Sequence, residues 1–163
     1  MRTNSRQIAF GGMMAALALV ITSLGGLIPV ATFVCPMVSM LILAFVIKMC
    51  GKRIGWAWYG AVAILGMLLG PDKEAAAVFV FLGFYPIIKP RLDGMKLGFL
   101  LKLILFNGLI LTMYSLLIRV LGMDAIAAEY QEMGRIMTIV LLLLGNINFV
   151  LIDQILGRFS KIK

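Results

Sequence analysis

The sequence predicts an all-α integral membrane protein, a bundle of six transmembrane helices with both termini in the cytoplasm. Three observations predict this class. Of the 163 residues, 63% are hydrophobic and 13% are charged, against roughly 25% charged in an average soluble domain. Apolar runs of membrane-spanning length recur along the chain, and cations gather beside alternate ends of these runs. This composition excludes a soluble globule, and it excludes a disordered chain because disorder requires low hydrophobicity.

Six apolar segments provide the predicted helices, and together they form one domain, residues 1–163. They comprise residues 7–24, 32–50, 54–70, 74–88, 97–121 and 134–157. Glycine, proline or clustered charge separates each segment from the next, and these residues are typical of helix ends. The fourth segment is expected to be short and to end at Lys89-Pro90-Arg91. Residues 122–133 are expected to form an outer connection before the sixth segment.

The distribution of cations predicts the orientation of the bundle. If six helices alternate in direction, twelve of the fifteen Lys and Arg residues fall on one side, and the other side receives Lys73, Arg119 and Arg135. The positive-inside rule places the cation-rich side in the cytoplasm, so we expect a plasma-membrane protein with cytoplasmic termini. The net charge of +8 is dispersed over four segments that flank the spans. This dispersal favours contact with the lipid bilayer over nucleic acid.

The residue types that are missing limit the chemistry. The sequence contains no histidine, which excludes histidine-based nucleophile pairs and histidine metal motifs. It also lacks Cys-x-x-Cys pairs and glycine-rich nucleotide-binding motifs. Asp153 is the one acid deep in a predicted span, and a lone carboxylate supplies no acid–base pair. We therefore expect a protein that is not an enzyme and has neither a metal site nor a cofactor.

Polar residues inside the spans are the candidate functional residues, because such groups are costly in hydrocarbon and tend to mark function. On the sixth span, four of them share one sector of about 80° around the helix: Arg135, Thr138, Asn146 and Asp153. We expect a substrate cavity near the outer side between the fourth, fifth and sixth spans, covered by residues 129–131. The predicted substrate-binding residues are Tyr85, Asn107, Tyr114, Tyr130, Arg135, Thr138 and Asn146.

Structural roles for several polar residues remain open as alternatives. Asn107 and Asn146 would then hydrogen-bond across helices, as polar residues do in membrane bundles. Asp153 would pair with Lys102 or Lys48 near the cytoplasmic face. Asp72 is expected to cap the fourth span. The aromatic group Trp56, Trp58 and Tyr59 is typical of a belt at the membrane interface.

The first span carries a strip of small residues. Gly11 with Ala15, and Gly12 with Ala16, form two small-xxx-small pairs, which allow close approach of another helix. That helix belongs either to this chain or to a partner.

With the Ala-rich first span and the predicted topology, this strip makes the chain resemble the substrate-binding S component of energy-coupling factor (ECF) transporters. The resemblance implies that Gly11, Gly12, Ala15 and Ala16 dock on a transmembrane scaffold subunit, which works with two cytoplasmic ATPases. It also implies capture of a vitamin-like small molecule at the outer face. Two alternatives stay open. One is a membrane accessory or assembly protein that acts through helix–helix contacts. The other is a proton-coupled carrier with Asp153 and Asn146 on its path.

Overall fold

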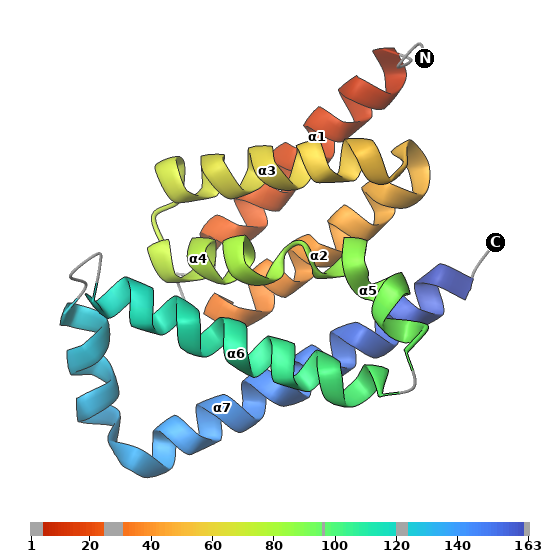
Figure 1. The fold of residues 1–163 in the computed structure, drawn as a ribbon. Coiled ribbons are helices and arrows are strands. Elements are labelled where there is room, and N and C mark those ends of the chain that lie inside the picture. The colour runs from red at the N-terminus through yellow and green to blue at the C-terminus, as the bar shows by residue number, and fades with distance from the viewer. Residues whose placement is uncertain (1–4, 25–30, 96, 120–123, 162–163) are drawn as a thin grey trace.

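The computed structural model describes residues 5–24, 31–95, 97–119 and 124–161, and their side chains except those of 124–138, 141 and 160–161. Every regular element in these residues is a helix (Figure 1). In chain order the helices are α1 (Ser5–Ser23), α2 (Ala31–Cys50), α3 (Lys52–Leu69), α4 (Lys73–Leu82), α5 (Tyr85–Asp93), α6 (Gly98–Arg119) and α7 (Asp124–Lys161). The all-α class is confirmed.

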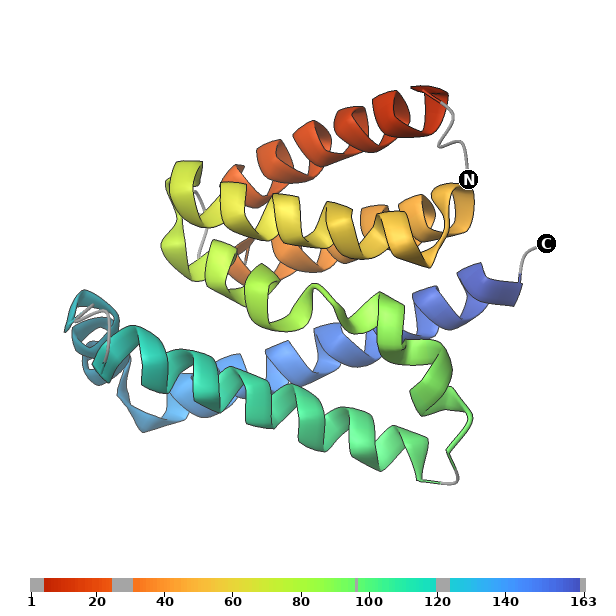
Figure 2. The ribbon, with the colours of Figure 1, turned by 45° about the horizontal axis from the view of Figure 1, so that its top comes forward.

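The helices run back and forth between two ends of a bundle (Figures 1 and 2). The start of α1 and the end of α7 lie at one end, which we call the terminal end, and the opposite end is called the distal end. Helices α1, α2, α3 and α4 pack together, while α6 and α7 lie beside each other on the other side of the bundle. One buried apolar cluster contains side chains from each of the five helices α1, α2, α3, α4 and α5. A second cluster contains side chains from α2, α4, α5, α6 and α7.

Five helices among the described residues are long and apolar enough to cross a membrane. They are α1, α2, the α4–α5 unit, α6 and the Leu142–Phe159 part of α7. Large apolar side chains also cover the outside of the bundle, where Leu68, Leu69 and Leu97 are each more than 70% exposed. Such surfaces are typical of helices that face lipid. Helix α3 is not among the five, because Lys52 and Arg53 at its start lower its hydropathy.

The fourth predicted span is longer than expected and is broken in the middle. Helix α4 ends at Leu82, and α5 begins at Tyr85 and continues through Pro90 to Asp93. Pro86 explains the break, because it has no N–H to donate to the carbonyl of Leu82. It fits the first turn of α5, where N–H groups have no helical partner. The predicted end at Lys89-Pro90-Arg91 is therefore wrong.

The outer connection predicted at residues 122–133 is also wrong over most of its length. Helix α7 begins at Asp124 and runs as one element of 38 residues to Lys161. Residues 125–133 are rich in Ala, Glu, Gln and Met and contain no proline, so their intrinsic preference favours helix. The glycine at 134, at which the sixth span was expected to begin, costs only about 1 kcal/mol inside a helix.

Helix α3 packs closely against α1 and α2. The chain reverses between α2 and α3 within one residue, Gly51, whose φ of 89° suits glycine. Trp58 is 5% exposed and donates its Nε1–H to the carbonyl of Gly11 at 2.9 Å. Trp58 therefore packs inside the bundle, and its assignment to an interfacial belt is wrong. Trp56, by contrast, is 49% exposed and lies on the outside of the bundle.

We expect Gly55→Ala to destabilise the fold and Gly60→Ala to be tolerated. A Cβ at Gly55 would lie 2.6 Å from Ile47 Cγ1, whereas a Cβ at Gly60 would meet nothing within 4 Å. Overpacking of this kind costs about 1–3 kcal/mol, while glycine to alanine in an open helix position is stabilising by up to about 1 kcal/mol. Thermal unfolding in detergent micelles measures both. Equal melting temperatures for the two variants would contradict this packing of α2 on α3.

Candidate functional site

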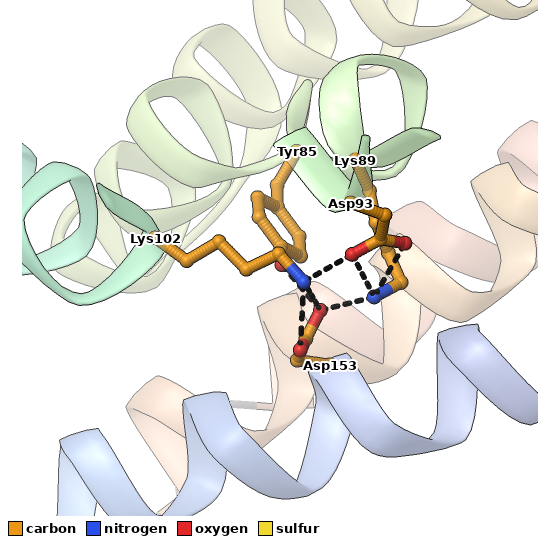
Figure 3. Close-up of polar contacts among 5 residues, drawn as sticks. All are labelled: Tyr85, Lys89, Asp93, Lys102 and Asp153. Atoms are coloured by element: carbon orange, nitrogen blue, oxygen red, sulfur yellow. Dashed lines mark hydrogen bonds and ion pairs between the residues drawn. The ribbon is translucent and has the colours of Figure 1, made fainter. Parts of the chain in front are cut away.

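Among the side chains that the structure describes, polar groups gather in a cluster near the terminal end that joins α5, α6 and α7 (Figure 3). Asp153 of α7 accepts hydrogen bonds from the Tyr85 hydroxyl and from the ammonium groups of Lys89 and Lys102. Lys102 Nζ lies 3.1 Å from both oxygens of Asp153. Asp93 accepts from the same two lysines. We call these five residues the ionic cluster.

The ionic cluster is largely shielded from its surroundings. The side chains of Lys89 and Lys102 are each 7% exposed, and that of Asp153 is 14% exposed. The two lysines balance the two aspartates in formal charge. This balance matters because an unpaired charge at such depth costs several kcal/mol. Of the two partners considered for Asp153, Lys102 is confirmed, while Lys48 lies 4.9 Å from the ring centroid of Phe159.

Local structure brings the ionic cluster together. Because α5 continues past Pro90, Lys89 and Asp93 lie one turn apart on the same helix face. Tyr85 occupies the first turn of α5 and is fully buried, with its ring 4.9 Å from that of Phe149 on α7. Tyr85 was expected in a substrate cavity near the outer side, and the structure places its hydroxyl on Asp153 instead.

A second polar contact lies between α6 and α7. The amides of Asn107 and Asn146 bond each other reciprocally, at 2.9 and 3.2 Å. Each amide also donates to the carbonyl four residues earlier in its own helix, Leu103 and Leu142 respectively. The expectation of a cross-helix hydrogen bond is confirmed. Both donors of each amide are thus used within the protein.

A third group of polar residues lies toward the distal end, at the start of α4. Asp72 accepts from the Ala75 N–H at 3.0 Å, which confirms the predicted cap. Its second carboxylate oxygen lies 3.4 Å from the Thr32 hydroxyl. The Tyr114 hydroxyl of α6 donates to Glu74 of α4. Tyr114 thus occupies the distal half of the bundle, as expected, with an acidic neighbour that the sequence did not reveal.

Three candidates on the first part of α7 lie outside the residues whose side chains the structure describes. They are Tyr130, Arg135 and Thr138. Their backbone belongs to the helix, and the start of α7 lies near the end of α6 at the distal end (Figure 1).

The small residues of α1 divide between two faces. Gly11 is buried against Trp58, and Ala15 packs on the apolar cluster that joins α1 to α5. Gly12 and Ala16 are exposed, and a Cβ at Gly12 would meet nothing within 4 Å. One small-xxx-small pair therefore serves packing within the chain, and the other lies on the outside of the bundle.

The ionic cluster is suited to holding helices together at depth. Among the described residues, no three Asp, Glu or Cys side chains are grouped as metal ligands. The place of Lys89 and Asp93 in the ionic cluster was not predicted from the sequence, because Pro90 was taken as the end of the span. Their spacing of four residues was the signal that would have found them, had the helix been extended.

We expect Asp153→Asn to destabilise the protein by about 3 kcal/mol, because it removes a buried carboxylate, 14% exposed, that accepts from both lysines and from Tyr85. Asp93→Asn removes the same charge from the same cluster, but that side chain is 43% exposed. Its cost should therefore be about 1 kcal/mol or less. Denaturant unfolding in micelles compares the two variants. Equal losses would show that burial does not set the cost.

The asparagine pair is tested by a double-mutant cycle. We expect Asn107→Leu and Asn146→Leu to be non-additive, with a coupling energy of about 0.6 kcal/mol, typical of polar pairs in membrane bundles. Asn148→Leu is the matched control, since it removes an amide from the same helix two residues away and is expected to add to Asn107→Leu. Additivity of the asparagine pair itself would contradict the reciprocal bond.

Comparison with known proteins gives no relative from which a function could be transferred. No family model, no curated protein and no solved structure matches the chain.

Proposed function

We propose that this chain is the substrate-binding membrane subunit of an ECF-type uptake transporter. It captures a vitamin-like small molecule at the outer face and depends on a transmembrane scaffold and two cytoplasmic ATPases for energy. The observation that carries the proposal is the outward pair Gly12 and Ala16 on α1. Internal packing uses Gly11 and Ala15 and leaves this second pair for a partner helix.

The proposal includes six membrane crossings with cytoplasmic termini. Helix α3 is the sixth crossing, because Lys52 and Arg53 can extend to the headgroups while its remaining residues stay in hydrocarbon. The common position of the two termini supports an even number of crossings (Figure 2). Exposed cations at the terminal end support its cytoplasmic orientation. They include Lys52, Arg53, Arg91 and Arg158.

The proposed substrate site lies in the distal half, between α4, α6 and the start of α7. Tyr114 and Glu74 supply an aromatic face and a carboxylate there, and Tyr130, Arg135 and Thr138 complete the site from α7. An aromatic surface with a few polar groups suits a flat, partly polar ligand. Tyr85, Asn107 and Asn146 have a structural role in this proposal, because their polar groups bond side chains of neighbouring helices.

Mass spectrometry of the gently extracted full-length chain tests the proposal. We expect a scaffold subunit with ATPases, or a small molecule near one per chain, in the same sample. Gly12→Leu or Ala16→Leu should lower recovery of the scaffold by at least about fivefold, since overpacking costs about 1–3 kcal/mol. Met13→Leu is the control, because it changes neither size nor polarity on the same exposed face.

Recovery of neither a small molecule nor an ATP-driven scaffold would contradict the proposal. That result would favour the accessory-protein alternative, in which helix–helix contact is the whole function. Unchanged recovery of the scaffold with Gly12→Leu and Ala16→Leu would show that this pair does not dock on the scaffold.

A further inference from the structure

Two neighbouring cavities open near the terminal end, and they differ in character. The first, which we call the head cavity, has a volume of about 270 Å³ and lies between α2, α5 and α7. Its lining includes Lys48, Lys89 and Asp93. The second, which we call the apolar groove, has a volume of about 300 Å³ and lies between α1, α2 and α7. Every residue that lines the groove is apolar, among them Met14, Leu41, Phe45 and Ile155.

The two cavities adjoin each other. Ala44 of α2 and Phe159 of α7 line both of them. Ala44 has the smallest side chain in either lining, so the junction is narrowed little at that point. The Lys48 ammonium lies 4.9 Å from the centroid of the Phe159 ring, and the Phe45 ring centroid lies 6.1 Å from the same centroid. A ligand that fills both cavities therefore needs a polar part joined directly to an apolar part.

The charge of the head cavity favours an anion. Two lysines and one aspartate line it. Asp93 is in contact with Lys89 and with Lys102 of the ionic cluster (Figure 3). Asp93 and Asp153 together balance Lys89 and Lys102, so the positive formal charge that remains in the lining is that of the exposed Lys48.

We propose that the head cavity and the apolar groove together bind one anionic phospholipid. Its phosphate lies beside Lys48 and Lys89, and one acyl chain lies along the groove formed by α1, α2 and α7. The second acyl chain remains in the surrounding bilayer. A lipid held in this way joins α2 to the last turns of α7. It acts as a fixed component of the bundle and is independent of the substrate site at the distal end.

Native mass spectrometry of the delipidated full-length chain in mild detergent tests this proposal. Dioleoyl phosphatidylglycerol is titrated against dioleoyl phosphatidylcholine, and inorganic phosphate is added as a competitor. We expect a single phosphatidylglycerol to bind, phosphatidylcholine to bind more weakly, and inorganic phosphate not to compete, because most of the apolar contact needs the acyl chain. Thermal stabilisation by the same lipids provides a second readout.

Variants separate the site from general attraction to a basic surface. Lys48→Gln should weaken phosphatidylglycerol binding about fivefold, the effect of one cation beside an anionic headgroup, and Lys48→Arg should retain it. Ala44→Phe should weaken binding by narrowing the junction. Lys52→Gln is the matched control, because Lys52 is an exposed cation at the same end that does not line the head cavity.

Several outcomes would overturn the proposal. Equal losses with Lys48→Gln and Lys52→Gln would show diffuse surface attraction. Equal binding of the two lipids would remove the role of charge, and competition by inorganic phosphate would show a free-anion site. A polypeptide that occupies the groove in place of lipid would assign the surface to a partner helix. Lys48 is exposed, so its variants should fold even if Ala44→Phe does not.

Discussion

Asp153 is the contact on which the terminal half of the bundle depends. Its carboxylate accepts hydrogen bonds from Tyr85 and Lys89 of α5 and from Lys102 of α6. One side chain of α7 therefore joins three helices. In hydrocarbon the separation of such charges is far more costly than in water. The ionic cluster therefore links the positions of α5, α6 and α7.

The rest of the bundle follows the same constraint, that a polar group at depth needs a partner within the protein. Helices α1 and α2 are joined by Thr22 and Ser39, whose hydroxyls lie 3.0 Å apart. Both hydroxyls also lie within hydrogen-bond distance of the carbonyl of Ala18. Trp58 joins α3 to α1, and Tyr59 joins α3 to α4. Among the described residues, no buried side-chain nitrogen or oxygen lacks a hydrogen-bond partner. The pairs α1–α2, α1–α3 and α3–α4 therefore each have a directional contact beside their apolar packing.

Sequence reasoning predicted the helices better than their ends and contacts. Long apolar runs determined α1, α2, α3 and α6, because membrane-spanning length leaves little choice of structure. Sequence reasoning failed at Pro90, which was taken as a helix end, and at residues 124–133, whose composition itself favours the helix that the structure shows. The cap at Asp72 was predicted from its place before the fourth span, and Lys102 was one of the two partners expected for Asp153. The division of the α1 strip was not predictable, since Gly11 and Gly12 are equally small and only the position of Trp58 distinguishes them.

The ionic cluster also bears on the proposed orientation. Lys89 and Lys102 were counted among the twelve cations of the cytoplasmic side, yet both are 6% exposed and paired with aspartates. Buried, paired lysines are poor indicators of orientation, because the rule reflects cations in loops and at the ends of spans. Without them, ten cations remain on one side against three on the other. The asymmetry survives, so the orientation depends on the cations at the ends of the spans, while the buried lysines hold the helices together.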